Sequence, residues 1–126
     1  GKTVLDAGAG SGETAFLFFL HGAKKVIAIE PDVKAIQCLA DNAFANGWNI
    51  QIINEAFHLK HLDIPHDYMK MDCEGCEGLL LSIDYEKPCV IEVHDRDTFE
   101  KFSARNFKRI HSFSKDISII SNCNES

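Results

Sequence analysis

One stretch near the start of the chain decides the fold: residues 4–13 read VLDAGAGSGE. An apolar strand ends in a carboxylate, three glycines follow at alternate positions, and a helical segment opens directly after them. Glycine adopts backbone angles that other residues resist, so such a turn lets a ligand lie against the main chain. The unpaired N–H groups at the start of the helix face the same turn. We therefore expect a ligand site between this strand and this helix.

Working outward, short apolar runs alternate with helical stretches along the whole chain. We expect strands at 3–7, 25–30, 50–54, 68–72 and 89–93, helices at 13–21, 33–46, 75–83 and 98–105, and a final hairpin formed by 109–113 and 117–120. Alternating strands and helices predict an α/β fold with a doubly wound, mostly parallel seven-stranded sheet and a C-terminal antiparallel hairpin. Because the helix at 13–21 is apolar nearly all round, it is expected to be buried.

Composition narrows the class of protein. The chain has 126 residues, which suits one domain, and its 13 basic and 19 acidic residues give a net charge of −6. This balance argues against a nucleic-acid partner, and no apolar run is long enough to span a membrane. We expect residues 1–126 to be a single core domain that lacks N-terminal flanking sequence. The oligomeric state is left open.

The charge of the glycine loop predicts its ligand. A dinucleotide site needs glycines spaced G-x-G-x-x-G, but here Glu13 occupies the sixth position and Asp6 precedes the loop. A carboxylate would repel a pyrophosphate, whereas it suits the ammonium group and sulfonium of S-adenosylmethionine. The alternatives are a plain glycine turn, an NAD-dependent oxidoreductase with a Rossmann domain, or a non-catalytic module that binds an adenosyl cofactor.

The second strand also ends in a carboxylate, Glu30, twenty residues beyond Gly10. A carboxylate at this place can accept hydrogen bonds from both ribose hydroxyls. Capping of the next helix is the alternative, and we expect Asp32 to be that cap.

The stretch from Asp6 to Gly12 resembles the first motif of the class I S-adenosylmethionine-dependent methyltransferases. The resemblance implies a Rossmann-like methyltransferase fold with Asp6, Gly8 and Gly10 around the amino-acid end of the cofactor, and it implies an adenine contact near Glu55 and Ala56. A surface loop is the other interpretation of that last segment. The complete predicted cofactor site comprises Asp6, Gly8, Ala9, Gly10, Gly12, Glu13, Glu30, Pro31, Asp32, Glu55, Ala56 and Asp72.

The segment after the fourth strand, residues 70–77, reads KMDCEGCE. A lysine inside an apolar strand should be paired, most simply with Asp72 or a neighbouring acid. Acids at a helix start also arise from pairing with the helix dipole. The segment is similar to the K-x-D-x-E-G-x-E pattern of FkbM-type methyltransferases. That resemblance implies methylation of a hydroxyl on a sugar or another small molecule, so the predicted acceptor is a small molecule or glycan.

Methyl transfer to a hydroxyl is helped by a base. The candidate catalytic residues are Lys70, Asp72, Glu74 and His94, the last at the end of the fifth strand, where a loop-bonded histidine is the alternative. No metal site is predicted, although a metal assisting the reaction is not excluded.

Five cysteines without a leader segment predict reduced thiols in the cytoplasm. The pair Cys73 and Cys76 is compatible with a zinc or redox site, but no second close pair completes a zinc site and the flanking acids disfavour a reactive thiolate.

Overall fold

The computed structural model describes residues 1–73, 75–114 and 117–123. Its strands are β1 (Thr3–Ala7), β2 (Lys25–Ile29), β3 (Ile50–Ile53), β4 (Tyr68–Met71), β5 (Cys89–Val93), β6 (Lys108–Ser112) and β7 (Ser118–Ser121). The α-helices are α1 (Glu13–Leu20), α2 (Val33–Asn46) and α3 (Arg96–Ser103), and two 3₁₀ helices are η1 (Leu59–Asp63) and η2 (Cys76–Ser82).

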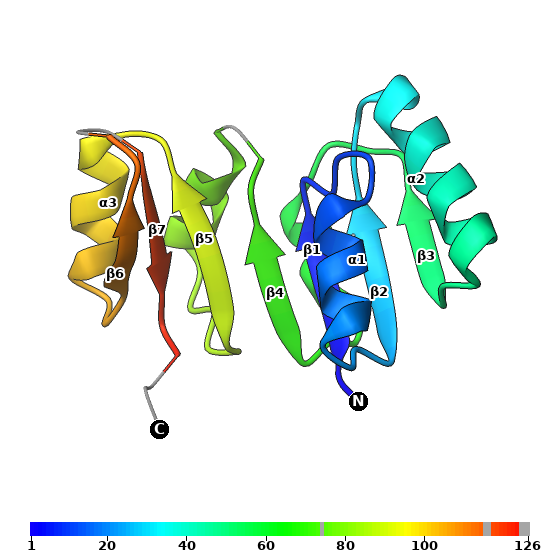
Figure 1. The fold of residues 1–126 in the computed structure, drawn as a ribbon. Helices are drawn as coiled ribbons and strands as arrows, with labels where there is room; N and C mark the ends of the chain where they lie inside the picture. The colour runs from blue at the N-terminus through cyan, green and yellow to red at the C-terminus, as the bar shows by residue number, and fades with distance from the viewer. Residues whose placement is uncertain (74, 115–116, 124–126) are drawn as a thin grey trace.

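The strands form one seven-stranded sheet in the order β3-β2-β1-β4-β5-β7-β6. Strands β1 to β5 are parallel, and β7 runs antiparallel to both β5 and β6. This arrangement confirms the predicted fold class. The order reverses between β1 and β4, and the carboxyl ends of β1 to β5 lie along the same edge of the sheet (Figure 1). In an open parallel sheet, ligands bind at that edge, outside the strand ends.

Each face of the sheet packs into its own apolar cluster. One cluster joins Val4, Val26 and Ala28 to Ala15 of α1 and Leu39 of α2. The other holds the alternate residues of the same strands together with Leu80 of η2 and Phe102 of α3. Alternation of side chains along a strand sends neighbours to opposite faces, so both faces must be covered.

The structure departs from two predictions about the helices, the burial of α1 and the kind of helix at 75–83. Helix α1 is not buried, because it rests on the sheet along one side and leaves Phe16, Leu17 and Leu20 49%, 51% and 66% exposed. On α2 the buried side chains are Leu39 and Ala43, and the apolar side chains of Val33, Ala40 and Phe44 are exposed. The predicted helix at 75–83 is the 3₁₀ helix η2, which follows a left-handed Gly75.

No helix in the described part of the chain is long and apolar enough to cross a bilayer.

Candidate functional site

The glycine loop, residues 8–12, is shaped by the strand beside it as much as by any ligand. Gly8 has φ +83°, and a Cβ there would overlap the carbonyl oxygen of Asp72. The N–H groups of Gly8 and Ala9 donate to the carbonyl of Ile29 at 2.9 and 3.2 Å. The loop is therefore pressed against the ends of β2 and β4, and Gly8 is required for that close approach.

Glu30 is held at the end of β2 by two backbone N–H groups. Gly10 donates to its Oε1 and Asp32 donates to its Oε2, each at 2.9 Å. The side chain is half-buried, and each carboxylate oxygen keeps a second lone pair for another donor. The two hydrogen bonds fix the carboxylate beside the glycine loop; ribose binding stays a prediction.

Two polar residues near Glu30, Asp32 and Asn54, make hydrogen bonds that hold the backbone after β2. Asp32 accepts a hydrogen bond from the Lys34 N–H at 3.0 Å, which confirms it as the cap of α2. Asn54, which follows β3, donates to the carbonyls of Glu30 and Pro31 at 2.9 and 3.1 Å. Asn54 was not predicted as a site residue; the signal available was an amide at the end of the predicted strand 50–54, at the edge where ligands bind.

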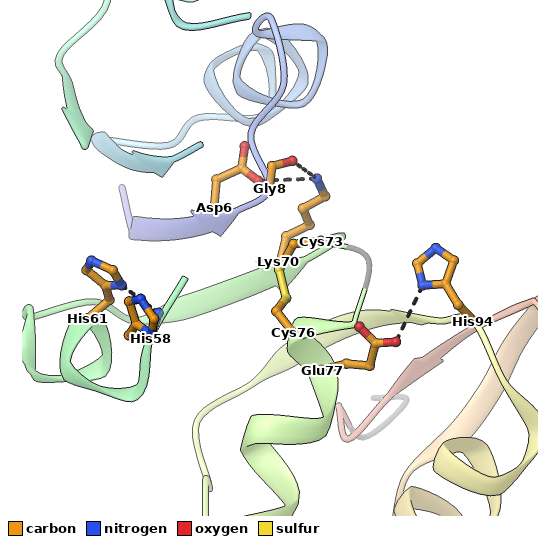
Figure 2. The surroundings of a disulfide bond; sticks show 9 residues. All are labelled: Asp6, Gly8, His58, His61, Lys70, Cys73, Cys76, Glu77 and His94. Carbon is orange, nitrogen blue, oxygen red and sulfur yellow. Dashed lines mark hydrogen bonds and ion pairs between the residues drawn. A yellow bond between two sulfur atoms is a disulfide. The ribbon is translucent and has the colours of Figure 1, made fainter. Parts of the chain in front are cut away.

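A buried ion pair lies beneath the loop. Asp6 is fully buried, and Lys70, its register partner on β4, places Nζ 3.3 Å from Asp6 Oδ1 (Figure 2). Lys70 also donates to the Gly8 carbonyl at 3.2 Å. Burial raises the pKa of Asp6, and the charge of Lys70 opposes that rise. The prediction that Lys70 is paired is confirmed, but its partner is Asp6 rather than Asp72, because adjacent parallel strands bring these two side chains level.

This pair changes what Asp6 and Lys70 can do. The Asp6 carboxylate is fully buried, so it cannot contact a ligand directly. It can affect a ligand only by holding Lys70, which donates to the Gly8 carbonyl. The Lys70 ammonium group is paired with Asp6 and hydrogen-bonded to the Gly8 carbonyl. Their predicted cofactor and catalytic roles are untested, and the geometry makes both of them supports of the glycine loop.

The predicted adenine segment, Glu55 and Ala56, is exposed, and its role stays a prediction. The Glu55 carboxylate is 2.9 Å from Lys60 Nζ and 3.6 Å from His61 Nε2, and its side chain is 45% exposed. Ala56 is also exposed. At the other end of the loop, the exposed Glu13 accepts a hydrogen bond from the Ser11 hydroxyl at 2.6 Å, which lowers the pKa of Glu13.

A second group of ionisable side chains gathers at the carboxyl ends of β4 and β5. One ligand-type atom each from Asp72, Glu92 and His94 lies within 4.8 Å of the others. A hydrogen bond shared with Asp72, then burial and the Asp72 charge, raise the pKa of Glu92 to about 7. Glu92 was not predicted as a site residue. Like Lys70, it is a charged residue inside an apolar strand, and this signal could have identified it. Glu74, a predicted catalytic residue, lies outside the described residues.

Cys73 and Cys76 form a disulfide at the end of β4 (Figure 2). The prediction of five reduced thiols is therefore wrong for this pair. The turn between β4 and η2, closed by the Cys76 N–H to the Cys73 carbonyl at 3.0 Å, brings the two Cα atoms to 5.5 Å, a separation that a disulfide can span.

The charges of the crevice suit an adenosyl sulfonium better than a dinucleotide. The Gly10 N–H, which a bound phosphate would need, is occupied by the Glu30 carboxylate. Residues 6–13 and 30–32, all of them described, contain no lysine or arginine, and Lys70 beneath them is already paired. A carboxylate and backbone groups remain to meet ribose hydroxyls and an ammonium group.

A comparison with protein families agrees with this geometry. The model of the ribosomal protein L11 methyltransferases (PrmA) matches residues 1–73, which is more than half of the chain. The chain belongs to the ribosomal protein L11 methyltransferase family. This membership confirms the predicted class of enzyme, a class I methyltransferase, and its S-adenosylmethionine cofactor.

Individual proteins show how far the likeness extends. The L11 methyltransferase of Enterobacter sp. is 51% identical over 72 residues, which cover 57% of this chain and 23% of that protein. The C-terminal domain of a Rhodobacter capsulatus precorrin-6Y C5,15-methyltransferase has the same fold, with a TM-score of 0.73 at 18% identity over 96% of this chain and 78% of that one. A Streptococcus mutans protein solved in complex with SAH has a TM-score of 0.66 at 14% identity, covering 96% and 87%.

Matches to three curated L11 methyltransferases span 16–23% of their length. Their name gives a ribosomal protein as the methyl acceptor. That finding overturns the predicted small-molecule or glycan acceptor. The predicted acceptor rested on residues 70–77, whereas the family match covers residues 1–73.

Proposed function

We propose that this protein transfers the methyl group of S-adenosylmethionine to a protein acceptor, with a ribosomal protein as the first candidate. The observation that carries the proposal is Glu30, fixed by the Gly10 N–H at 2.9 Å within a segment that the L11 methyltransferase family shares. When bound, S-adenosylmethionine supplies an already activated methyl group, so the protein mainly positions the reactants.

Each part of the crevice has a distinct task in this proposal. Glu30 accepts hydrogen bonds from the ribose hydroxyls with its remaining lone pairs. The glycine loop presents main chain to the cofactor, and the ion pair of Asp6 with Lys70 holds the loop in place through the Gly8 carbonyl. The side chains on β4 and β5, Asp72, Glu92 and His94, lie on the neighbouring strand ends, where the acceptor nucleophile must approach.

We further propose oxygen as the acceptor atom. The support is the resemblance of residues 70–77 to FkbM-type enzymes. The carboxylates and histidine of the same region add to it, because a hydroxyl is a weak nucleophile that needs help in losing its proton. Nitrogen is the alternative atom, and the names of the relatives do not distinguish the two. The predicted cytoplasmic location likewise stays a prediction.

The test uses S-adenosylmethionine with a tritiated methyl group, purified ribosomal proteins and the purified enzyme. Label on a protein band supports the proposal. Acid hydrolysis of that band followed by chromatography then distinguishes O-methylated from N-methylated amino acids. The Glu30→Ala variant should lose most of the labelling at low cofactor concentration. Label confined to a small-molecule fraction, or no transfer at all by an enzyme that binds the cofactor, would contradict the proposal.

A further inference from the structure

The side chains between β4 and β5 have the composition of a metal site. Asp72 follows β4, and Glu92 lies on the adjacent strand at the level expected from the register pairs Lys70 with Val90 and Met71 with Ile91. His94 comes two residues after Glu92 and therefore projects from the same side of the strand line. One ligand-type atom from each residue lies within 4.8 Å of the others.

A second observation, a buried carboxylate beside His94, also points to a ligand at this cluster. Glu77 of η2 is a carboxylate with a side chain only 3% exposed, and its Oε1 lies 3.5 Å from His94 Nδ1 (Figure 2). Neither Glu77 Oε2 nor His94 Nδ1 has a hydrogen-bond partner among the described residues. Burying a carboxylate costs free energy unless a partner compensates its charge. Within the described part of the chain, the Glu77 carboxylate is directed only at the imidazole of His94.

The direction of the imidazole follows from this contact. With Nδ1 facing Glu77, the other ring nitrogen, Nε2, lies 3.9 Å from Glu92 Oε1. Histidines that bind metals commonly donate their second N–H to a carboxylate, which fixes the ring and its tautomer. Glu77 is placed to do this for His94.

Among the described residues, no lysine or arginine pairs with this group. Lys70, on the neighbouring strand, extends to Asp6 and the Gly8 carbonyl instead (Figure 2). Two carboxylates and an imidazole therefore share one space. Ligand atoms around a single ion lie about 3–4 Å apart, because each bond to the metal is about 2.0–2.2 Å long. Asp72 is exposed and Glu92 and His94 are partly exposed, so a small inward movement of the side chains reaches that spacing.

We propose that Asp72, Glu92 and His94 bind one divalent transition cation, of the Mn²⁺ or Zn²⁺ class, and that the buried Glu77 positions His94 for it. Two oxygens and one imidazole nitrogen favour these ions over Ca²⁺, which takes six to eight oxygen ligands. If the proposed methyl transfer also holds, the ion lies where it can bind an acceptor hydroxyl and promote loss of its proton. Binding of the ion itself does not depend on that function.

The test measures Mn²⁺ binding without cofactor or acceptor. After treatment with a chelator and its removal, the protein is titrated with MnCl₂ by calorimetry and by the loss of the free Mn²⁺ signal in electron paramagnetic resonance. Mn²⁺ is the deciding probe because it avoids thiols, and the exposed Cys38 and Cys123 would attract Zn²⁺. We expect one Mn²⁺ per chain.

Two variants and one control locate the ion. Glu92→Gln removes a ligand and should weaken Mn²⁺ binding about 100-fold, and Glu77→Gln should weaken it about 10-fold, within the range for partners that orient a ligand. The control is Glu100→Gln, an exposed glutamate on α3 that pairs with Arg96, and it should bind as the wild type does. Circular dichroism identifies conditions in which every variant is folded.

A spectroscopic readout separates positioning from simple stability. In ¹⁵N-histidine spectra, Zn²⁺ should shift Nε2 of His94 in the wild type, and in Glu77→Gln the shift should be divided between the two ring nitrogens. No Mn²⁺ binding by the wild type, or equal affinity in Glu92→Gln, overturns the proposal. Because no methyl transfer is measured, failure of the metal site and failure of the proposed function are distinguishable.

Discussion

The two sides of the crevice treat their polar groups differently. On the β1–β2 side, Glu30 accepts hydrogen bonds from two backbone N–H groups. The buried Asp6 carboxylate has no hydrogen-bond partner among the described residues, but the charge of Lys70 lies 3.3 Å away. On the β4–β5 side, Asp72 and Glu92 crowd each other, and Glu77 Oε2 has no hydrogen-bond partner among the described residues. The fold supplies a counter-charge on the first side, whereas no lysine or arginine of the described residues pairs with the two carboxylates on the second side.

The largest expected effect on the free energy of unfolding comes from breaking the ion pair between Asp6 and Lys70. Lys70→Met leaves Asp6 buried without its counter-charge, so we expect a loss of about 3–5 kcal/mol in the free energy of unfolding. Urea denaturation measures it. The double variant Asp6→Leu/Lys70→Met should recover most of the loss, since an apolar pair of similar volume needs no charge compensation. Losses that simply add in the double variant would show that the two side chains do not stabilise each other.

The close approach of the glycine loop to β4 gives the next effect. Gly8→Ala adds a Cβ that overlaps the Asp72 carbonyl oxygen, whereas a Cβ added at Gly22, with φ +93°, would meet no atom within 4 Å. Both alanines are strained by positive φ, so Gly22→Ala is the matched control. We expect Gly8→Ala to cost about 1–3 kcal/mol more in unfolding free energy, as overpacking does. Equal losses would mean that the loop can move away from β4 freely.

The ribose assignment of Glu30 is tested by cofactor affinity. Glu30→Ala should weaken S-adenosylmethionine binding by about 1–3 kcal/mol, because charge-assisted hydrogen bonds to the hydroxyls are lost. Calorimetric titration gives the value. Glu86→Ala, at the opposite edge of the sheet before β5, is the control and should bind normally. An unchanged affinity in Glu30→Ala would remove Glu30 from the cofactor site.

The smallest effect concerns pH and lies away from the crevice. Burial lowers the pKa of His66, whose ring contacts the Ile64 carbonyl at 2.7 Å and the Tyr85 hydroxyl at 2.9 Å. The unfolded chain therefore binds the proton first, and the stability that the neutral ring contributes is lost as pH falls below about 6.5. Urea midpoints at pH 7.5 and 5.5 measure the loss. His66→Gln should reduce it; an unaltered pH dependence would assign the effect to another group.

The same contrast explains what the sequence could predict. Strands β1 and β5 have the predicted bounds, because apolar runs and glycine turns are local signals. The Asp32 cap follows from its position just before a helical pattern, and the structure confirms it. The ribose role of Glu30 stays a prediction. The partner of Lys70 could not be read locally, since it depends on β1 lying beside β4 in the sheet.

Other features depended on how elements pack. The exposure of Phe16 and Leu17 follows from one side of α1 resting on the sheet, and periodicity cannot say which side that is. Glu77 and His94 meet only because η2 folds back against β5. The acceptor was mispredicted because a short motif was taken to specify a substrate, whereas residues 1–73 carry the family relationship.

One measurement tests the central claim most directly: calorimetric titration of the purified protein with S-adenosylmethionine and, in parallel, with NAD⁺. A crevice in which Glu30 occupies the Gly10 N–H should bind S-adenosylmethionine saturably, one molecule per chain, and should give no heat with NAD⁺. Saturable binding of NAD⁺, with none of S-adenosylmethionine, would contradict the assignment of this crevice to an adenosyl sulfonium.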